Sequence, residues 1–354
     1  MEGLGMTPGF WKDKTVFLTG HTGFKGGWVA HWLHKLGASV YGYSLEPPTQ
    51  PNFFTETHLQ NRLAHSNMGD IRDLAALTSA LKQAKPDIII HMAAQPLVRE
   101  SYNTPVETFA ANVMGTVNLL EAARQVGTAK AIVNITTDKC YENKEWLWPY
   151  RENDRLGGHD PYSTSKACAE IAAAAYRHSF LEDANIQLAS VRAGNVIGGG
   201  DWATDRLIPD FLRALDAGET LKIRSPNAIR PWQHVLEPLS GYLLLAEKLY
   251  TEGSAFAEAW NFGPSEEDAK SVGWIVKQLC VQIPDTRWET ENSKQPHEAG
   301  LLKLDSSKAK SKLGWTPRWN LETALSKTIE WHQAWHKRED MSAVTSEQIQ
   351  AYIE

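Results

Sequence analysis

Short apolar runs alternate with longer stretches of helical pattern through the first half of the chain. The runs are rich in β-branched and aromatic residues and are bounded by turn residues, which is typical of buried strands. The expected strands are Thr15–Thr19, Ser39–Tyr43, Asp87–His91 and Ala131–Ile135, and the expected helices are residues 25–36, 73–84, 105–126 and 162–180. This rhythm predicts an α/β fold, with a doubly wound sheet of parallel strands.

The residue composition changes after a further predicted strand at Gln187–Val191. Glycines, prolines and basic residues dominate from Arg192 as far as Trp232. We therefore expect a large domain, a smaller mixed α/β lobe at the C-terminal side and a polar end. The expected parts are residues 10–192 for the large domain, to which 231–260 could return, 193–230 and 261–336 for the lobe, and 337–354 as a surface helix or tail.

Composition narrows the classes of function. The chain has 354 residues with a formal charge of −6, which argues against general binding to nucleic acid. Its cysteines, Cys140, Cys168 and Cys280, are odd in number and lack the spacing of metal ligands, so a reducing compartment and no metal are expected. The N-terminal residues lack a basic stretch followed by an apolar core, and no uninterrupted apolar segment is long enough to span a membrane. We expect a soluble, cytoplasmic protein without a membrane partner.

A glycine-rich turn follows the first predicted strand directly. Its glycines stand three residues apart, and a predicted helix begins within it. Such glycines allow a tight turn and the close approach of a pyrophosphate, whose charge is favoured by the free N–H groups at the start of a helix. A dinucleotide site is expected here, with contacts from Gly20, Thr22, Gly23, Phe24, Lys25 and Gly26.

The end of the second predicted strand bears on the choice of dinucleotide. An acid is common at this point for the adenosine ribose of NAD, and an arginine for the 2′-phosphate of NADP. The sequence offers Ser44, Leu45 and Glu46. The lack of an arginine there favours NAD over NADP, with Ser44 in the expected place of the acid. Further on, Asp70 and Ile71 could contact the adenine, although Asp70 could equally cap a helix.

Tyr162 and Lys166 can indicate the type of reaction as well as the ligand. A helix places residues four apart on one face, so the Lys166 ammonium can lie near the Tyr162 phenol and favour its ionised form. Such a tyrosine can take a proton from an alcohol while a hydride leaves the same carbon. Since the spacing also occurs by chance on solvated helices, other residues must support this interpretation.

Two other strand ends provide that support. Small residues follow the strand that ends at His91, and Thr137 follows the strand that ends at Ile135. The carboxyl ends of parallel strands share one edge of the sheet, where ligands collect. We expect Thr137 to join Tyr162 and Lys166 there, with further cofactor contacts from Ala93, Ala94 and Gln95.

With these motifs, the chain from about Lys14 to Trp331 resembles the extended short-chain dehydrogenase/reductase family, in its nucleotide-sugar branch. The resemblance implies a Rossmann-type domain that binds NAD(P), a smaller lobe for the sugar nucleotide, and a homodimer or dimer of dimers formed through the helices at 105–126 and 162–180. It also implies a cofactor contact from Asn112. The matching strings are Asn112-Val-Met-Gly-Thr116, Arg192-Ala-Gly-Asn195-Val-Ile-Gly198 and Leu313-Gly-Trp-Thr-Pro317.

Asp138 distinguishes two activities within that branch, 4-epimerase and 4,6-dehydratase. A 4-epimerase oxidises C4 and returns hydride to the same carbon, so it needs no second acid. A 4,6-dehydratase must also expel the C6 hydroxyl, which an adjacent carboxyl can protonate. In the family's glucose dehydratases a glutamate typically follows this aspartate as the C5 base, whereas this chain has Lys139. We hypothesise that Lys139 occupies the base position, with Glu142 or a route through Asp138 as alternatives.

Further strings resemble the CDP-glucose group of these dehydratases, among them Thr136-Thr-Asp-Lys-Cys-Tyr-Glu142 and Arg230-Pro-Trp-Gln-His-Val-Leu-Glu-Pro238. The resemblance implies conversion of CDP-D-glucose to CDP-4-keto-6-deoxy-D-glucose and water, in a route to deoxysugars for a cell-surface polysaccharide such as an O-antigen. Candidate substrate residues are Asn195, Arg206 and Arg230 for the diphosphate, Trp232 for the base and His297 for the ribose. The rivals are a 4-epimerase, a dehydratase for another nucleotide sugar and a non-catalytic dinucleotide sensor.

Overall fold

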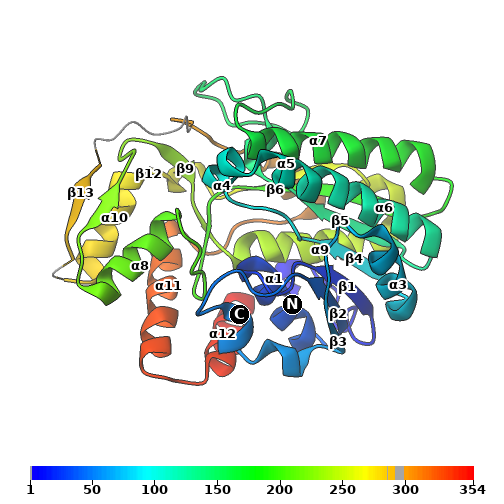
Figure 1. Cartoon of the computed structure of the whole chain (residues 1–354), viewed down its shortest axis with the longest axis horizontal. Coiled ribbons are helices and arrows are strands. Elements are labelled where there is room, and N and C mark those ends of the chain that lie inside the picture. Colours follow the sequence, from blue (N-terminus) through cyan, green and yellow to red (C-terminus); the bar gives the residue numbers. More distant parts are fainter. Residues whose placement is uncertain (1, 285, 292–298) are drawn as a thin grey trace.

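A seven-stranded parallel sheet forms the centre of the larger part of the molecule (Figure 1). The computed structural model describes residues 2–284, 286–291 and 299–354. The strand order is β11-β6-β5-β4-β1-β2-β3, so the chain winds outward in both directions from β1 and β4. The strands are β1 (Thr15–Thr19), β2 (Ser39–Ser44), β3 (His65–Met68), β4 (Ile88–His91), β5 (Ala131–Ile135), β6 (Gln187–Ala193) and β11 (Ala259–Phe262). This doubly wound order confirms the predicted Rossmann-type α/β fold class, and it puts a ligand-binding crevice at the carboxyl ends of β1 and β4.

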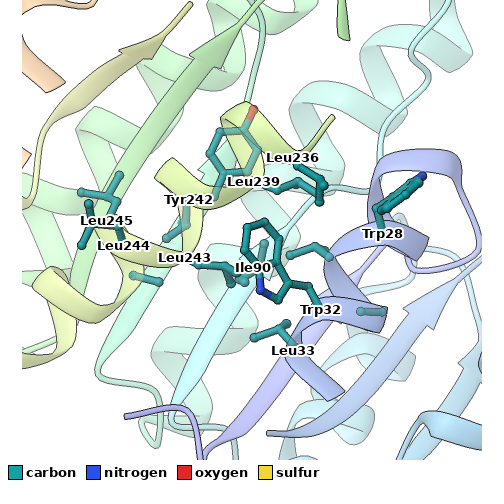
Figure 2. Close-up of a cluster of buried hydrophobic side chains, with 14 of the residues drawn as sticks. Trp28, Trp32, Leu33, Ile90, Leu236, Leu239, Tyr242, Leu243, Leu244 and Leu245 are labelled. Carbon is teal, nitrogen blue, oxygen red and sulfur yellow. The ribbon is translucent and has the colours of Figure 1, made fainter. Parts of the chain in front are cut away.

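Alternating side chains of the strands build a core on each face of the sheet. Phe17 and Ile89 face the layer of α3 (Leu74–Ala84), α6 (Gly115–Val126) and α7 (Pro161–Tyr176). Val16 and Ile90 face α1 (Phe24–Lys35) and α9 (Leu236–Glu252) on the other side. Figure 2 shows this second core, in which Trp32 of α1 lies against the leucines of α9. Because both faces are buried, the strands read as nearly continuous apolar runs.

The two long predicted helices each contain one wider turn. Residues 105–126 form α5 (Pro105–Phe109), a π-helical turn (Ala110–Met114) and α6, and α7 continues into a second π turn (Arg177–Leu181). The start of α7 is fixed locally. Asp160 accepts a hydrogen bond from the Ser163 backbone at 2.9 Å, and Pro161 occupies the first turn, where its missing N–H is not needed. This cap sets the positions of Tyr162 and Lys166 at the edge of the sheet.

A smaller group of elements lies at the left of Figure 1 and has its own core. Phe211, Ile275 and Leu325 belong to that core. Its helices are α8 (Leu207–Ala217), α10 (Val272–Gln282) and α11 (Leu321–His336), and its strand pairs are β7 (Val196–Ile197) with β10 (Gln233–His234), β8 (Leu221–Ile223) with β13 (Trp288–Thr290), and β9 (Ile229–Pro231) with β12 (Ala269–Ser271).

Three later segments lie with the large sheet. Helix α9 packs on β5 and β6, and β11 pairs with β6 as the outermost strand. Helix α12 (Met341–Ile353) packs on α1 through buried Ile349 and Tyr352. The remaining α-helices of the described residues are the short α2 (Phe53–Glu56) and α4 (Val98–Asn103). In the described part of the chain, no helix has the length and apolar character needed to cross a membrane.

Candidate active site

A cavity of about 1160 Å³ opens at the carboxyl ends of the central strands and extends to the smaller group of elements. Every residue that the sequence proposed for the site lines this cavity except Asn112, the alternative base Glu142 and His297. His297 lies outside the described residues. The cavity is large enough for two extended ligands, because drug-sized pockets span about 300–1,000 Å³.

The glycine turn forms one end of the cavity. Gly20 has φ +81°, and a Cβ there would lie 2.8 Å from the backbone nitrogen of Ala93. Glycine therefore lets the turn contact the segment after β4 closely. Helix α1 begins at Phe24, and its N-cap residue Gly23 provides no side-chain hydrogen bond. The first N–H groups of α1 are consequently available to an anion in the cavity, which fits the pyrophosphate of a dinucleotide.

The residues after β2 and β3 form the far side of this end. Thr22 Oγ1 donates to the carbonyl of Leu45 at 2.8 Å and lies 2.8 Å from Ser44 Oγ, while Glu46 lines the cavity from an exposed position. Asp70 pairs with Arg72 at 2.5 Å, so the charge of this arginine is engaged. The N-cap of α3 is Asp73, whose carboxylate accepts from Ala76 N at 3.0 Å, and the alternative role of Asp70 as that cap is wrong.

Asn112 lies behind the cavity wall and not on it. Its Oδ1 accepts from Gln95 N at 2.8 Å, and its Nδ2 donates to Gln95 O at 3.0 Å and to Ser165 Oγ at 2.9 Å. All of its polar atoms are thus engaged with the protein. The residue holds the loop that carries Gln95 against α7, and its contact with a cofactor stays a prediction.

Thr137, Tyr162 and Lys166 all line the cavity. Burial raises the pKa of Tyr162 to about 12, against the effect of a hydrogen bond with Thr137 that lowers it. Burial also lowers the pKa of Lys166 to about 8, and its Nζ donates to the carbonyl of Ile135 at 3.3 Å. Lys166, which the sequence predicted to lower the pKa of Tyr162, is not among the groups that do so. Burial raises this pKa, and the opposing effects come from Thr137 and Arg206.

Asp138 is the buried acid of the cavity, with 2% of its surface exposed. Its Oδ1 accepts from Thr137 Oγ1 at 3.0 Å, whereas its Oδ2 has no hydrogen-bond partner among the described residues. A Cβ at Gly194 would overlap Oδ2, so glycine leaves the space that this oxygen occupies. Burial raises the pKa of Asp138, while Lys139 and Arg230 oppose that rise. The arrangement suits a carboxyl that holds a proton and can deliver it.

Besides a route through Asp138, the candidates for the C5 base are Lys139 and Glu142, which lie in different places. Lys139 lines the cavity beside Asp138. Glu142 is not among the residues that line it, and its carboxylate pairs with Lys144 at 2.6 Å and with Arg155 at 3.3 Å. The geometry therefore removes Glu142 as a base that contacts the sugar.

A buried ion pair that the sequence patterns did not predict supports the loop that carries Asp138. Arg192 of β6 makes two hydrogen bonds to Glu170 of α7, at 2.9 and 3.0 Å, and a third to Tyr141 Oη at 2.9 Å. Glu170 also accepts from Thr136 Oγ1 at 2.5 Å. Both ends of the loop that carries Asp138 are thus tied to one charge pair. A helical glutamate four residues after Lys166 was the one available signal.

The other end of the cavity is rich in cations. Arg206 pairs with Asp201 at 2.8 Å and faces Tyr162, and Arg230 donates to the backbone carbonyls of Ile229 and Ala299. Trp232 lines the cavity and donates to Lys270 O at 3.0 Å. Asn195 completes the proposed substrate residues on the wall. Three further basic residues that the sequence patterns did not indicate also line the cavity: Arg99, Lys222 and Arg224.

Lys25 connects the two ends electrostatically. Its Nζ donates to Tyr242 Oη of α9 at 3.3 Å, and Figure 2 shows Tyr242 at the top of the core. Burial, with the charges of Lys166 and Arg206, lowers the pKa of Lys25 to about 7. The pattern predicted only a contact to the dinucleotide here. The structure adds that this lysine changes charge near neutral pH.

The comparisons identify the class of protein to which this fold and site belong. The model of the GDP-mannose 4,6 dehydratase family matches residues 17–328, and the chain belongs to that family. The CDP-glucose 4,6-dehydratase of Salmonella typhimurium is 55% identical over 350 residues, which cover 97% of each chain. The predicted resemblance to nucleotide-sugar 4,6-dehydratases is confirmed.

Solved structures agree with this placement. The structure of MoeE5 in complex with UDP-glucose and NAD has a TM-score of 0.76 at 26% identity, over 91% of this chain and 99% of that one. The dTDP-glucose 4,6-dehydratase of Bacillus anthracis in complex with NAD has a TM-score of 0.73 at 21% identity, over 92% and 99% of the two chains. At that identity the second likeness concerns the fold alone.

Proposed function

We propose that this chain is an NAD-dependent 4,6-dehydratase that converts CDP-D-glucose to CDP-4-keto-6-deoxy-D-glucose and water. The near full-length identity to the Salmonella enzyme supports the substrate. The structural observation that carries the reaction type is the buried Asp138 carboxyl beside Thr137 and Tyr162 in the same cavity. A 4-epimerase, which expels no hydroxyl, has no use for that acid.

Each catalytic residue has a proposed task at a stated atom. Tyr162 Oη takes the proton of the C4 hydroxyl, and Thr137 Oγ1 holds the sugar oxygen. Lys166 Nζ positions the cofactor ribose. When bound, NAD would accept the hydride from C4 and later give it to C6. Asp138 Oδ2 protonates the departing C6 hydroxyl, which leaves as water, so the substrate loses two hydrogens and one oxygen in total.

Lys139 is our proposal for the base that removes the C5 proton, and a proton returns to C5 when hydride reaches C6. It lines the cavity beside Asp138, whereas Glu142 does not. The C5 proton is acidic once C4 is a ketone, so a weak base suffices. In K139A, exchange of the C5 hydrogen with solvent deuterium should slow together with turnover, while K144A, which alters the lysine paired with Glu142, should leave both unchanged. Full turnover and normal exchange in K139A would remove this role.

The cationic end of the cavity supports a further proposal about the lobe. We propose that residues 193–230 and 261–336 bind the nucleotide sugar, with Asn195, Arg206 and Arg230 at the diphosphate and Trp232 at the base. Residues 10–192 bind NAD, whose contacts include the glycine turn. Guanidinium groups suit this task because they contact phosphate oxygens in pairs.

A homodimer, alone or paired into a dimer of dimers, is proposed through the helices of the 105–126 and 162–180 regions. Val106 is 74% exposed and Ile171 is 58% exposed on these helices. Exposed apolar side chains gathered on neighbouring helices mark interaction surfaces. In light scattering on a sizing column, I171E should lower the mass to that of a monomer, whereas V281E, at a 75% exposed site on α10, should not. A wild-type monomer, or an intact I171E dimer, would contradict the proposal.

We also propose a cytoplasmic location and a role in supplying deoxysugars for a cell-surface polysaccharide. The three cysteines, Cys140, Cys168 and Cys280, are free thiols, as expected in a reducing compartment. Fractionation of cells that express the chain, with antibody detection, tests the location.

A set of parallel incubations tests the proposed dehydratase activity against the other candidate functions. The protein is mixed with NAD and, separately, CDP-, UDP-, GDP- and dTDP-glucose, and the products are weighed by mass spectrometry. A loss of one water from CDP-glucose is expected. An isomer of unchanged mass would indicate a 4-epimerase, a loss of water from another nucleotide sugar would correct the base, and no product from any would favour a sensor.

A further inference from the structure

Three potential metal ligands converge outside the cavity, where α8 meets α11. His332 and His336 stand four residues apart on one face of α11, and Asp216 stands near the end of α8. His332 Nε2 lies 2.9 Å from Asp216 Oδ1, and His336 Nε2 lies 2.8 Å from the same oxygen. The two Nε2 atoms are 3.2 Å apart. Among the residues described, this is the one group of three such ligands found.

Hydrogen bonding alone does not satisfy this arrangement. A neutral imidazole has one N–H, and a carboxylate only accepts. If both Nε2 atoms donate to Asp216, the 3.2 Å contact joins two donors; if one donates to the other, a contact with Asp216 is lost. A single cation between the three atoms satisfies all of them at once.

The spacing suits a tetrahedral site. Zinc binds imidazole nitrogen and carboxylate oxygen at about 2.0–2.2 Å, which places the ligand atoms of a tetrahedron about 3.3 Å apart. The three separations here are 2.8, 2.9 and 3.2 Å. A small outward adjustment of the side chains would admit the ion. Two imidazoles and one carboxylate form a donor set that suits Zn²⁺ and its late first-row neighbours better than Mg²⁺ or Ca²⁺.

The surroundings allow the ion to enter and be held. His332 is 6% exposed, whereas Asp216 is 29% and His336 49% exposed, so one ligand is fixed in the packed interior and the open side faces water. The helices are held together by their shared core, which includes Phe211 of α8 and Leu325 of α11. A water molecule can take the fourth position.

We propose that Asp216, His332 and His336 form a zinc-binding site that clamps the end of α8 to α11. The first turn of α8 lines the substrate end of the cavity, and the proposed clamp lies at the opposite end of that helix. The ion is therefore structural: it contacts neither substrate nor cofactor. Its ligand is a divalent cation of the zinc class with one exchangeable water.

Zinc titration of the untagged, EDTA-treated full chain tests the site. Calorimetry should show one Zn²⁺ per chain with a dissociation constant of about 10 µM or tighter, and D216N and H336Q should each bind at least about tenfold more weakly. His178, which pairs with Glu182 at the same four-residue spacing without a third ligand, provides the control, and H178Q should bind like wild type. Saturating zinc should raise the Tm of wild type by about 3 °C and leave those of D216N and H336Q unchanged.

A second readout locates the ion. The Trp335 ring lies 5.6 Å from that of His332 and 4.9 Å from that of His336, so Cu²⁺ or Ni²⁺ in the site should quench part of the tryptophan fluorescence in wild type and less in H336Q. Failure of wild type to bind zinc saturably below about 100 µM would overturn the proposal. So would binding that D216N and H336Q leave unchanged, since the zinc would then lie elsewhere.

Discussion

Replacing Asp138 by asparagine should separate the two halves of the reaction. Asparagine keeps the size of the side chain, and its Oδ1 can still accept from Thr137 Oγ1, a bond of 3.0 Å in wild type. The atom that replaces Oδ2 is an amide nitrogen, which cannot protonate a leaving hydroxyl. In the proposed mechanism, oxidation at C4 depends on Tyr162 and Lys166, which the change leaves in place.

The size of the effect follows from the position of Asp138. General acid catalysis contributes about 10²–10⁴-fold to a rate. Burial raises the pKa of this carboxyl, so a larger share carries the needed proton near neutral pH than would on the surface. We expect a fall of about 10³-fold in turnover, or about 4 kcal/mol in activation free energy.

Two measurements on the same sample show where the variant stops. Mass spectrometry follows loss of water, and near-ultraviolet absorbance follows reduced NAD. D138N should accumulate reduced cofactor in the first turnover while water loss is slow. The control is E142Q, the same carboxyl-to-amide change in a residue outside the cavity, which should behave like wild type. Turnover by D138N within about threefold of wild type would refute the role of Asp138 as the acid.

Three other changes probe the remaining parts of the site. Y162F should lose at least about 10²-fold in turnover without accumulating reduced NAD, as seen in the same absorbance assay, because the first proton transfer fails. K25M should be more stable than wild type in urea at pH 6.5 and should lose this advantage as pH rises. The pKa of Lys25 falls from 10.5 to about 7 on folding, so wild type gains at most about 3 kcal/mol between pH 7 and 9, and an unchanged difference would refute the charge assignment. E170A should lower the free energy of unfolding by about 3–5 kcal/mol in urea, because it leaves Arg192 buried without its partner; a loss below about 1 kcal/mol would show that water reaches the pair.

The sequence was sufficient for those parts of the fold that depend on local pattern. Strands β1, β2, β4, β5 and β6 are short runs rich in apolar residues, and the glycine turn and Tyr162 follow strands or helix starts with recognisable chemistry. The edge strand β3 reads His-Ser-Asn-Met and carries no such run. Strand β11 was not predicted from the pattern, because it carries Asn261 in its middle. That side chain is buried and bonded to Tyr141 Oη at 2.7 Å and to the Tyr150 carbonyl at 2.9 Å. A polar residue in a core strand is explained by partners more than a hundred residues away, which no local pattern reveals.

The same limit applies to the groups that support the site. Glu170 reads as part of a solvated helix face until the fold brings Arg192 to it from β6. The spacing of His332 and His336 is visible in the sequence, but Asp216 precedes them by more than a hundred residues, so the expectation of no metal followed from cysteines alone. For Asn112, the family motif implied contact with the cofactor, which stays a prediction, and in the fold its amide holds Gln95.

The charges that line the cavity couple anion binding to protonation of the buried lysines. Lys25 and Lys166 both have lowered pKa values because burial disfavours their charged forms, and Lys166 and Arg206 lower that of Lys25 further. A pyrophosphate at the start of α1 reverses this balance, since a nearby negative charge favours the ammonium form. By linkage, a ligand that raises these pKa values is bound more tightly as the pH falls through them. The charges of Lys139 and Arg230 oppose protonation of Asp138, so the acid must be kept protonated chiefly by its burial. The Oδ2 atom of Asp138 lies next to Gly194 and has no hydrogen-bond partner among the described residues. This buried, unbonded environment is therefore as necessary to the proposed chemistry as the carboxyl itself.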